Sequence, residues 1–219
     1  MNRIPVGSIP GLPESLLSYT TNAPLYDSSC SPDARVWFSD RDGGMYIKTA
    51  PVGTLKAEAD MNAFFHSKNM GPEVLSYLSL DADWMVTRAV PGEDCIHPKH
   101  LENPKRLSET LGILLRQLHS TDHTGCPITL PHPEKDDPVL IHGDYCLPNV
   151  MLDNWQFSGF IDVGCGGIGD RHIDLYWGCW SIQYNLKDSR WCSRFLDAYG
   201  RQDVDPEKLR ILHSLEFPE

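Results

Sequence analysis

Positive charge is scarce in this sequence. Nineteen Lys and Arg residues stand against 30 Asp and Glu residues, so the formal net charge is −11 at pH 7. Proteins that bind nucleic acid neutralise its phosphates with clustered basic side chains. The charge balance therefore argues against nucleic acid as a partner. An acidic surface is explained first by solubility, and it would also attract a small cationic substrate.

Long apolar runs and paired cysteines are also missing. No stretch approaches the ~18 consecutive apolar residues of a membrane span, and Pro and Gly interrupt residues 1–17, where a signal peptide would have an apolar core. The seven cysteines are scattered without a Cys-x-x-Cys pair, so we expect neither a disulfide framework nor a zinc site. These absences predict a reduced, cytoplasmic protein without a membrane partner. The sequence is silent on oligomeric state, and a monomer is the default.

The order of hydrophobic patterns predicts an α+β fold in two lobes. Alternating residues on either side of Asp42-Gly43 indicate a hairpin, and a helix is expected over about 53–68. The expected strands of this part are 34–39, 45–49, 74–80 and 84–90. We therefore expect a small antiparallel-sheet lobe over residues 1–90, with a hinge near 88–95.

The remaining residues, 91–219, read as a mostly helical lobe. Residues 104–119 carry a single stripe of leucines, which is typical of an amphipathic helix. The tail after residue 173 is also helical in pattern, and its large apolar side chains are expected in the core. These are Trp177, Trp180, Trp191, Phe195 and Leu196.

Polar residues with kinase spacing interrupt the stretch VLIHGDYCLPNVMLDNWQFSGFIDVG, residues 139–164. Asp144 and Asn149 follow the D-x-x-x-x-N spacing in which kinases use the Asp to receive a proton and the Asn to hold Mg²⁺. Asp162 follows the apolar FSGFI, and a hairpin would return it close to Asn149 as a second hard oxygen ligand. Each residue alone is equally explained as the cap of a turn, but the ordered set favours a phosphate-transfer site.

Residues suited to holding a nucleotide precede this stretch. Lys48 lies in the apolar strand MYIKT, where an unpaired ammonium group is costly. Glu58, on the following helix, is the expected partner, as in the Lys–Glu pair of kinases. The alternatives are an exposed strand-end lysine and a glutamate on a solvated helix face. The Gly-rich loop of protein kinases is missing, and DSSCSPDARVW (27–37) offers hydroxyls and exposed amides in its place.

The segment HGDYCLPNVMLDNWQFSGFIDVGCGGIGDRHIDL closely resembles the signature of the aminoglycoside 3'-phosphotransferases, which are small-molecule kinases with a protein-kinase-like fold. The segments SCSPDARVW, VTRAVPGED and FLDAYG resemble that family in the same order. The resemblance implies that Asp144 is the catalytic base and that Asn149 and Asp162 are magnesium ligands. It also implies that Lys48 and Glu58 orient the α- and β-phosphates.

The resemblance further implies a nucleotide site, with ATP or GTP as the donor and Mg²⁺ as the cofactor. A loop would close over the nucleotide, an aromatic ring would stack on adenine, and the hinge backbone would bind its edge. The residues implied are Ser29, Cys30 and Ser31 for the loop, Tyr46 for the ring, and the backbone from Thr87 to Ala89 for the hinge.

The part that would bind the phosphate acceptor departs from the family pattern. The family usually has a longer, acid-rich segment before the HGD motif, but only about two dozen residues separate His119 from His142 here. Cys165 stands where the family usually has Arg, and an acidic residue of the next helix is replaced near Tyr184. The acidic candidates that remain are Asp170, Asp174, Glu216 and Glu219, with Glu134, Asp136 and Asp137 in the short segment.

The sequence thus predicts a kinase that moves the γ-phosphate of ATP to a hydroxyl of an aminoglycoside, a 3'-phosphorylation that confers antibiotic resistance. One alternative is a kinase of another small hydroxylated compound, which the shortened acceptor segment favours. The other alternative is a catalytically silent nucleotide-binding protein that acts through interactions, although such a relic would be expected to lose Asp144 or Asp162.

Overall fold

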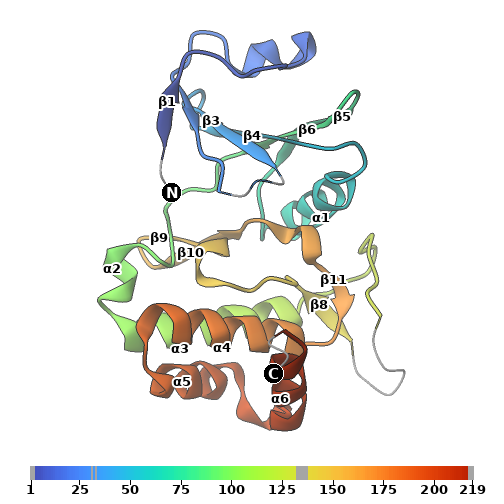
Figure 1. Cartoon of the computed structure of the whole chain (residues 1–219). Coiled ribbons are helices and arrows are strands. Elements are labelled where there is room, and N and C mark those ends of the chain that lie inside the picture. The colour runs from blue at the N-terminus through green and yellow to red at the C-terminus, as the bar shows by residue number, and fades with distance from the viewer. Residues whose placement is uncertain (1–2, 31, 33, 132–137, 217–219) are drawn as a thin grey trace.

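The computed structural model describes residues 3–30, 32, 34–131 and 138–216. An antiparallel sheet forms one end of the molecule and the longer helices form the other (Figure 1). The sheet has six strands in the order β1-β2-β3-β4-β6-β5. Its strands are β1 (Ile4–Val6), β2 (Leu25–Asp27), β3 (Arg35–Ser39), β4 (Met45–Ala50), β5 (Val74–Ser79) and β6 (Asp83–Arg88).

The predicted hairpin is confirmed as β3 and β4, in which Arg35 pairs with Thr49 and Ser39 with Met45. Asp42 and Gly43 adopt positive φ angles of 48° and 91°, which is the backbone geometry that favours Asp-Gly in such turns. The predicted helix is α1 (Lys56–Ser67). Together these elements place Lys48 on a central strand and Glu58 on the helix beside it.

Side chains alternate across this sheet, so its two faces differ. Trp37, Ile47, Trp84 and Val86 pack together in a buried cluster on one face. Residues at the neighbouring positions of the same strands, Val36, Tyr46, Lys48 and Met85, line a cleft on the other face. The sheet therefore separates a packed core from an open cleft.

The rest of the chain contains the helices and two small sheets. Strands β7 (Glu93–Asp94), β9 (Val150–Asp153) and β10 (Gln156–Phe160) form one sheet, and β8 (Val139–Ile141) pairs with β11 (Gly167–Gly169). The helices are α2 (Pro98–Leu101), α3 (Pro104–His119), α4 (His172–Leu186), α5 (Ser189–Tyr199) and α6 (Pro206–Glu216). Short 3-10 turns are formed by Glu14–Tyr19 (η1), Leu147–Asn149 (η2), Val163–Cys165 (η3) and Arg201–Asp203 (η4).

Helix α3 confirms the helix predicted over residues 104–119. Its five-leucine stripe, which includes Leu107 and Leu118, is buried throughout in the main hydrophobic cluster. The same cluster takes in Phe195 and Leu196 of α5 and Phe160 of β10. This core supports the loops that connect β8 to β9 and β10 to β11.

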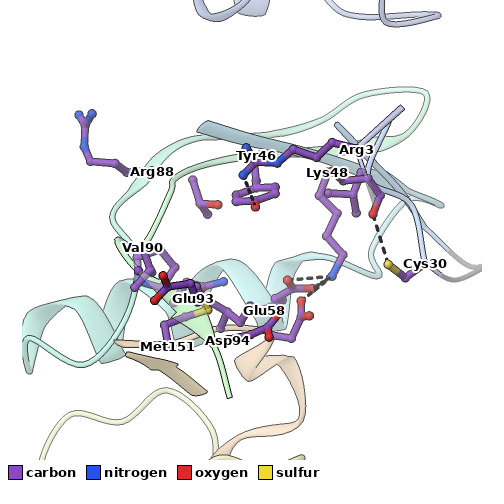
Figure 2. Close-up of a pocket in the computed structure, with 18 of the residues that line it drawn as sticks. Arg3, Cys30, Tyr46, Lys48, Glu58, Arg88, Val90, Glu93, Asp94 and Met151 are labelled. Carbon is purple, nitrogen blue, oxygen red and sulfur yellow. Dashed lines mark hydrogen bonds and ion pairs between the residues drawn. The ribbon is translucent and has the colours of Figure 1, made fainter. Parts of the chain in front are cut away.

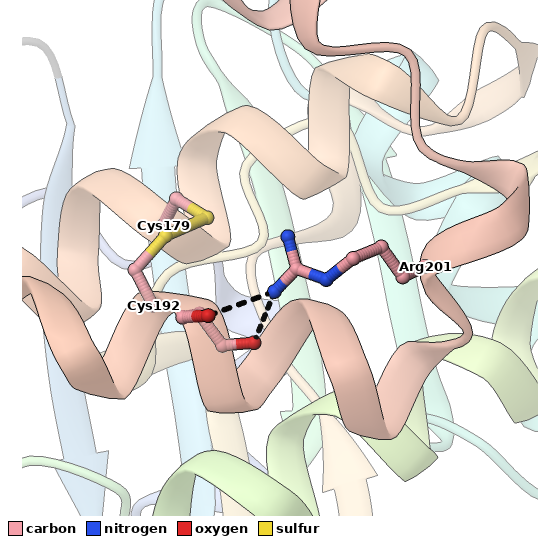
Figure 3. The surroundings of a disulfide bond; sticks show 4 residues. Cys179, Cys192 and Arg201 are labelled. Carbon is pink, nitrogen blue, oxygen red and sulfur yellow. Dashed lines mark hydrogen bonds between the residues drawn. A yellow bond between two sulfur atoms is a disulfide. The ribbon is translucent and has the colours of Figure 1, made fainter.

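Two expectations about the helical tail were wrong. Trp177 and Trp180 belong to none of the hydrophobic clusters of described residues, because α4 is apolar on most of its faces and its pattern did not identify the inner one. The structure also pairs Cys179 with Cys192 as a disulfide between α4 and α5, where we expected no disulfide (Figure 3). Packing of the two helices brings the Cα atoms to 5.0 Å across 13 residues, a spacing that corresponds to no recognisable motif.

Nearby, the Arg201 guanidinium donates hydrogen bonds to the carbonyl and hydroxyl oxygens of Ser193 at 2.7 and 2.9 Å (Figure 3). These bonds hold the turn after α5 against that helix. Among the described residues, none of the helices has both the length and the apolar character that crossing a membrane requires.

Candidate active site

The loop that follows β8 fixes the position of Asp144. Gly143 has a φ of +83°, and a Cβ atom there would lie 2.0 Å from the carbonyl oxygen of Cys165, so only glycine allows this close approach. Asn149 donates from Nδ2 to the carbonyl oxygen of Asp144 at 3.0 Å and to its Oδ2 at 2.8 Å. The predicted pair is therefore in direct contact, with one carboxylate oxygen of Asp144 held in place.

A network of buried hydrogen bonds supports this loop. The His142 ring accepts a hydrogen bond from the Asp144 amide at Nδ1 and lies 3.0 Å from the carbonyl oxygen of Ile161 at Nε2. This geometry fits a neutral ring protonated on Nε2. The Asp174 carboxylate accepts from the main-chain amides of His142 at 2.7 Å and Gly143 at 2.8 Å, and it contacts His119 Nε2 at 3.2 Å.

Asp174 was predicted to bind the acceptor, and the structure corrects that prediction. Its side chain is fully buried, and both of its oxygens accept main-chain hydrogen bonds. A carboxylate in this position cannot face a ligand. It holds the backbone of the loop that carries Asp144.

Asp162 lies across from Lys48 at the start of the turn η3. Its φ and ψ angles of 56° and 46° are left-handed, which is unusual for a residue other than glycine and typical of functional positions. The Lys48 ammonium contacts Asp162 Oδ1 at 3.5 Å and the two oxygens of Glu58 at 2.9 and 2.7 Å (Figure 2). The predicted Lys48–Glu58 pair is thus formed, and Asp162 lies beside it.

Burial and charge shape the protonation of this group. Burial alone would lower the pKa of Lys48, but the attraction of Glu58 and Asp162 outweighs burial and raises it. Burial raises the pKa of Glu58, and the pull of Lys48 offsets this only in part. The lysine is therefore held as a cation between two carboxylates, one of which, Asp162, is 54% exposed.

A cleft of about 800 Å³ lies on the open face of the sheet, and the Lys48–Glu58 pair forms part of its wall (Figure 2). Of the residues predicted to bind nucleotide, five line it: Cys30, Tyr46, Lys48, Glu58 and Thr87. Asp162, which was predicted as a magnesium ligand, lines it as well. Ser28 belongs to the predicted segment 27–37, although the sequence did not single it out. It also lines the cleft, and its buried hydroxyl has no hydrogen-bond partner within the described part of the chain.

The loop over the cleft is anchored by Ser29. Its hydroxyl accepts hydrogen bonds from the Val36 amide at 3.0 Å and from Arg35 Nε at 3.2 Å, so it holds the loop against β3. The exposed Cys30 lies next to it, with Sγ 3.4 Å from the Ser28 carbonyl oxygen. Ser31, which was predicted to act with them, lies outside the described residues.

The predicted adenine site is only partly as expected. Tyr46 lines the cleft, with its hydroxyl 3.1 Å from Arg3 and its ring 5.2 Å from that of Phe38. Thr87 also lines the cleft, but the Ala89 amide donates to the carbonyl oxygen of Gly44 at 2.9 Å. That amide is already engaged within the sheet, so it cannot also bind a base edge in this conformation.

Asp170 is held by neighbouring side chains. It lies 2.6 Å from the His172 ring at Oδ1 and 2.9 Å from the Lys208 ammonium of α6 at Oδ2. Burial alone would raise the pKa of Asp170, but the bonds from His172 and Lys208 hold it well below its usual range. Glu216 is the last residue of α6, while Glu219, Glu134, Asp136 and Asp137 lie outside the described residues.

The oxygen atoms beside Asp144 fit Mg²⁺. Asn149 Nδ2 is bonded to Asp144, which leaves the side-chain oxygen Oδ1 of Asn149 as a metal ligand. The exposed carboxylate of Asp162 offers a second hard oxygen. The main-chain amide of Ile161 donates to the main-chain carbonyl oxygen of Asn149, so the segments that carry Asn149 and Asp162 adjoin each other. The described residues contain no cluster of three or more His, Cys, Asp or Glu suited to a metal.

Comparison with known proteins identifies the group to which this arrangement belongs. Residues 127–212 match the Phosphotransferase enzyme family. A probable aminoglycoside 3'-phosphotransferase from Lactococcus lactis subsp. lactis is 37% identical over 251 positions, which cover 95% of each chain. The aminoglycoside 3'-phosphotransferase of Niallia circulans is 26% identical over 215 positions, which cover 78% of this chain and 82% of that protein.

Solved structures agree. An aminoglycoside-3'-phosphotransferase of type VIII matches with a TM-score of 0.72 at 25% identity, over 86% of this chain and 90% of that one. Aminoglycoside phosphotransferase APH(3'')-Id from Streptomyces rimosus, in complex with ADP and streptomycin, matches with a TM-score of 0.70 at 24% identity, over 83% and 89%. The Lactococcus alignment has more positions than the 219 residues present here, so segments of that relative have no counterpart. The chain belongs to the aminoglycoside 3'-phosphotransferase family and has the α+β, protein-kinase-like fold of these phosphotransferases.

Proposed function

We propose that this protein is an ATP-dependent kinase that transfers the γ-phosphate to a hydroxyl of an aminoglycoside and so confers resistance to the antibiotic. The observation that carries the proposal is the convergence of Lys48, Glu58 and Asp162 at a cleft. The main chain before Asp162 is bonded, through the Ile161 amide, to Asn149, which fixes Asp144. Family membership supports this choice of acceptor over other small hydroxylated compounds and over a silent nucleotide-binding protein.

Asp144 is the general base in this proposal. Asn149 holds Oδ2 of Asp144 at 2.8 Å, and Oδ1 is the oxygen that would receive the proton of the acceptor hydroxyl. As that proton moves to Asp144, the acceptor oxygen attacks the γ-phosphorus in line, and the bond to the β-phosphate oxygen breaks. The loop supported by Asp174 sets the direction of approach.

The other residues bind and orient the nucleotide. Lys48, kept charged by Glu58, would neutralise the α- and β-phosphates. Asn149 and Asp162 would hold Mg²⁺, which offsets the negative charge of the triphosphate when bound. Tyr46 would stack on the base beside Thr87, and Ser28 with the loop at Ser29 to Ser31 would face the phosphates.

Three further features belong to the proposal. We place the division between a nucleotide-binding lobe and a catalytic lobe at 90/91, where the chain leaves the sheet after β6. We expect the protein to act in the cytoplasm, and we take a monomer as the default. We propose ATP rather than GTP as the phosphate donor, because a solved relative was determined in complex with ADP.

The test is ADP release in a coupled assay with Mg-ATP and purified protein. Kanamycin and neomycin represent acceptors with a 3'-hydroxyl, and streptomycin represents the acceptor seen in a solved relative. We expect turnover with at least one of these acceptors, and we expect this turnover to disappear when Mg²⁺ is chelated. Nucleotide binding without turnover on any aminoglycoside would contradict it and would direct the search to other hydroxylated compounds.

A further inference from the structure

Aromatic side chains form a continuous row along helix α4. Trp180 stacks on Tyr184, with ring centroids 5.2 Å apart and planes 9° apart, and it meets Trp177 edge to face at 5.7 Å. Tyr184 is 59% exposed, and the two tryptophans are half-buried. We call these three residues the aromatic row. Contiguous apolar patches on a protein surface often mark binding sites when they are large.

The aromatic row lies on the helix that binds the catalytic loop, residues 142–147. Asp174, near the start of α4, binds the amides of His142 and Gly143, and Ser181 accepts a hydrogen bond from the Leu147 amide at 2.9 Å. The two anchor points are seven residues apart, which is about 10 Å along a helix. The loop between them, which contains Asp144, therefore runs beside the turn of α4 that bears the row.

Helix geometry also fixes the side on which the row lies. At 3.6 residues per turn, Trp177 is about 60° around the helix from Asp174, and Tyr184 is displaced from Ser181 in the same direction by the same angle. The opposite flank is closed, because a Cβ atom on Gly178 would lie 2.7 Å from the Phe195 ring of α5.

Helix α6 borders the row on its far side. The Tyr176 ring, further around α4, lies 6.2 Å from that of His213 of α6. Within the described residues, the row therefore occupies the strip of α4 between the catalytic loop and α6. This strip therefore adjoins the loop that carries Asp144.

The chemistry of the row suits a cation. The Lys187 ammonium already lies 4.3 Å from the centroid of the Tyr184 ring, so this surface attracts positive charge. Two of the acids predicted for the acceptor site are engaged elsewhere, because Asp174 is bound to main-chain amides and Asp170 to His172 and Lys208. The net charge of −11 further favours a cationic ligand.

We propose that the aromatic row is the acceptor-binding wall and that it selects amino sugars by ring–ammonium contacts and by stacking on the sugar face. This inference rests on the proposed function, and it assigns the specificity of the acceptor to Trp177, Trp180 and Tyr184. Binding of a positively charged sugar by rings in place of carboxylates also predicts a weak dependence on salt, because fewer full charges are paired.

The test compares Tyr184→Ala, Trp177→Ala and Trp177→Phe with the parent protein. Titration calorimetry with kanamycin gives the acceptor Kd, and ADP release gives KM and kcat for kanamycin and KM for ATP. We expect Tyr184→Ala and Trp177→Ala each to weaken acceptor binding about tenfold, with KM for ATP unaltered. Trp177→Phe, which retains a ring, should recover most of the affinity. Trp191→Phe on α5 is the matched control, since that tryptophan lies outside the row.

Two results would overturn the inference. An acceptor Kd unchanged by Tyr184→Ala and Trp177→Ala would remove the row from acceptor binding, while turnover by the parent protein would leave the proposed function standing. Sedimentation that shows a parent dimer, dissociated by Tyr184→Ala at constant acceptor Kd, would assign the row to contact with a second copy. Absence of turnover in the parent protein would instead refute the proposed function, and the calorimetric Kd would still decide the role of the row.

Discussion

Replacing Asp174 by Asn tests how the catalytic loop is held. The carboxylate is fully buried and accepts two main-chain amide bonds, from His142 and Gly143. Asn keeps one oxygen but turns an NH₂ group toward the second amide, so one charged hydrogen bond is lost and two donors face each other. Losses of this kind cost about 3–4 kcal/mol in total. For a domain of this size that corresponds to a fall in Tm of roughly 10 °C.

Catalysis should fall as well. Because Asp174 binds the backbone directly before Asp144, the loop will shift, and a displacement of ~1 Å at a reacting group costs about 100-fold in rate. Calorimetric melting and ADP release with the best acceptor measure the two effects. Asp188→Asn is the control, because Asp188 caps α5 through the Arg190 amide and Asn caps helices equally well. A variant at Asp174 that keeps the parent Tm and kcat would refute this account of the loop.

Three further predictions follow from the site. Glu58→Gln leaves Lys48 with Asp162 alone, so kcat/KM for ATP in the ADP-release assay should fall about 10- to 100-fold, and an unchanged value would separate the pair from nucleotide binding. Ser28→Ala removes the buried, unpaired hydroxyl of a residue that lines the cleft, so calorimetry should show ADP binding weakened about fivefold, whereas equal affinity would exclude a contact. Burial lowers the pKa of the His119 ring although Asp174 opposes this, so the folded state favours the neutral ring. The resulting contribution to folding stability is present above the ordinary histidine pKa of 6.5 and is lost as the pH falls below that value. Tm measured from about pH 7.5 to 5.5 should therefore fall less steeply in His119→Gln than in the parent, and parallel curves would contradict the assignment.

Much of the fold could be predicted because local patterns agree with the tertiary structure. The leucine stripe of residues 104–119 required one buried helix face, and the Asp42-Gly43 turn required a hairpin. Lys48, Asp144, Asn149 and Asp162 stand in motifs that combine residue type with spacing, and the structure brings Lys48 close to Asp162 and Asn149 close to Asp144.

What the sequence could not predict depends on contacts between distant segments. Asp174 and Asp170 are both acidic residues near the motif, and only their partners show their roles. Asp174 binds loop amides and supports the loop, whereas Asp170 pairs with Lys208. The Ala89 amide could not be known to bond with Gly44 before the sheet register was fixed. The same reason applies to Cys179, whose disulfide partner lies on the next helix.

The most direct test of the central claim is the mass of the acceptor after incubation with Mg-ATP and either the parent protein or Asp144→Asn. Asn is nearly the same size as Asp and cannot accept the hydroxyl proton as a base, so the account predicts transfer of one phosphoryl group by the parent and a loss of about 10²- to 10⁴-fold in the variant. ADP affinity should be the same for both proteins. Equal phosphorylation by parent and variant would contradict the role of Asp144 and, with it, the mechanism proposed for this site.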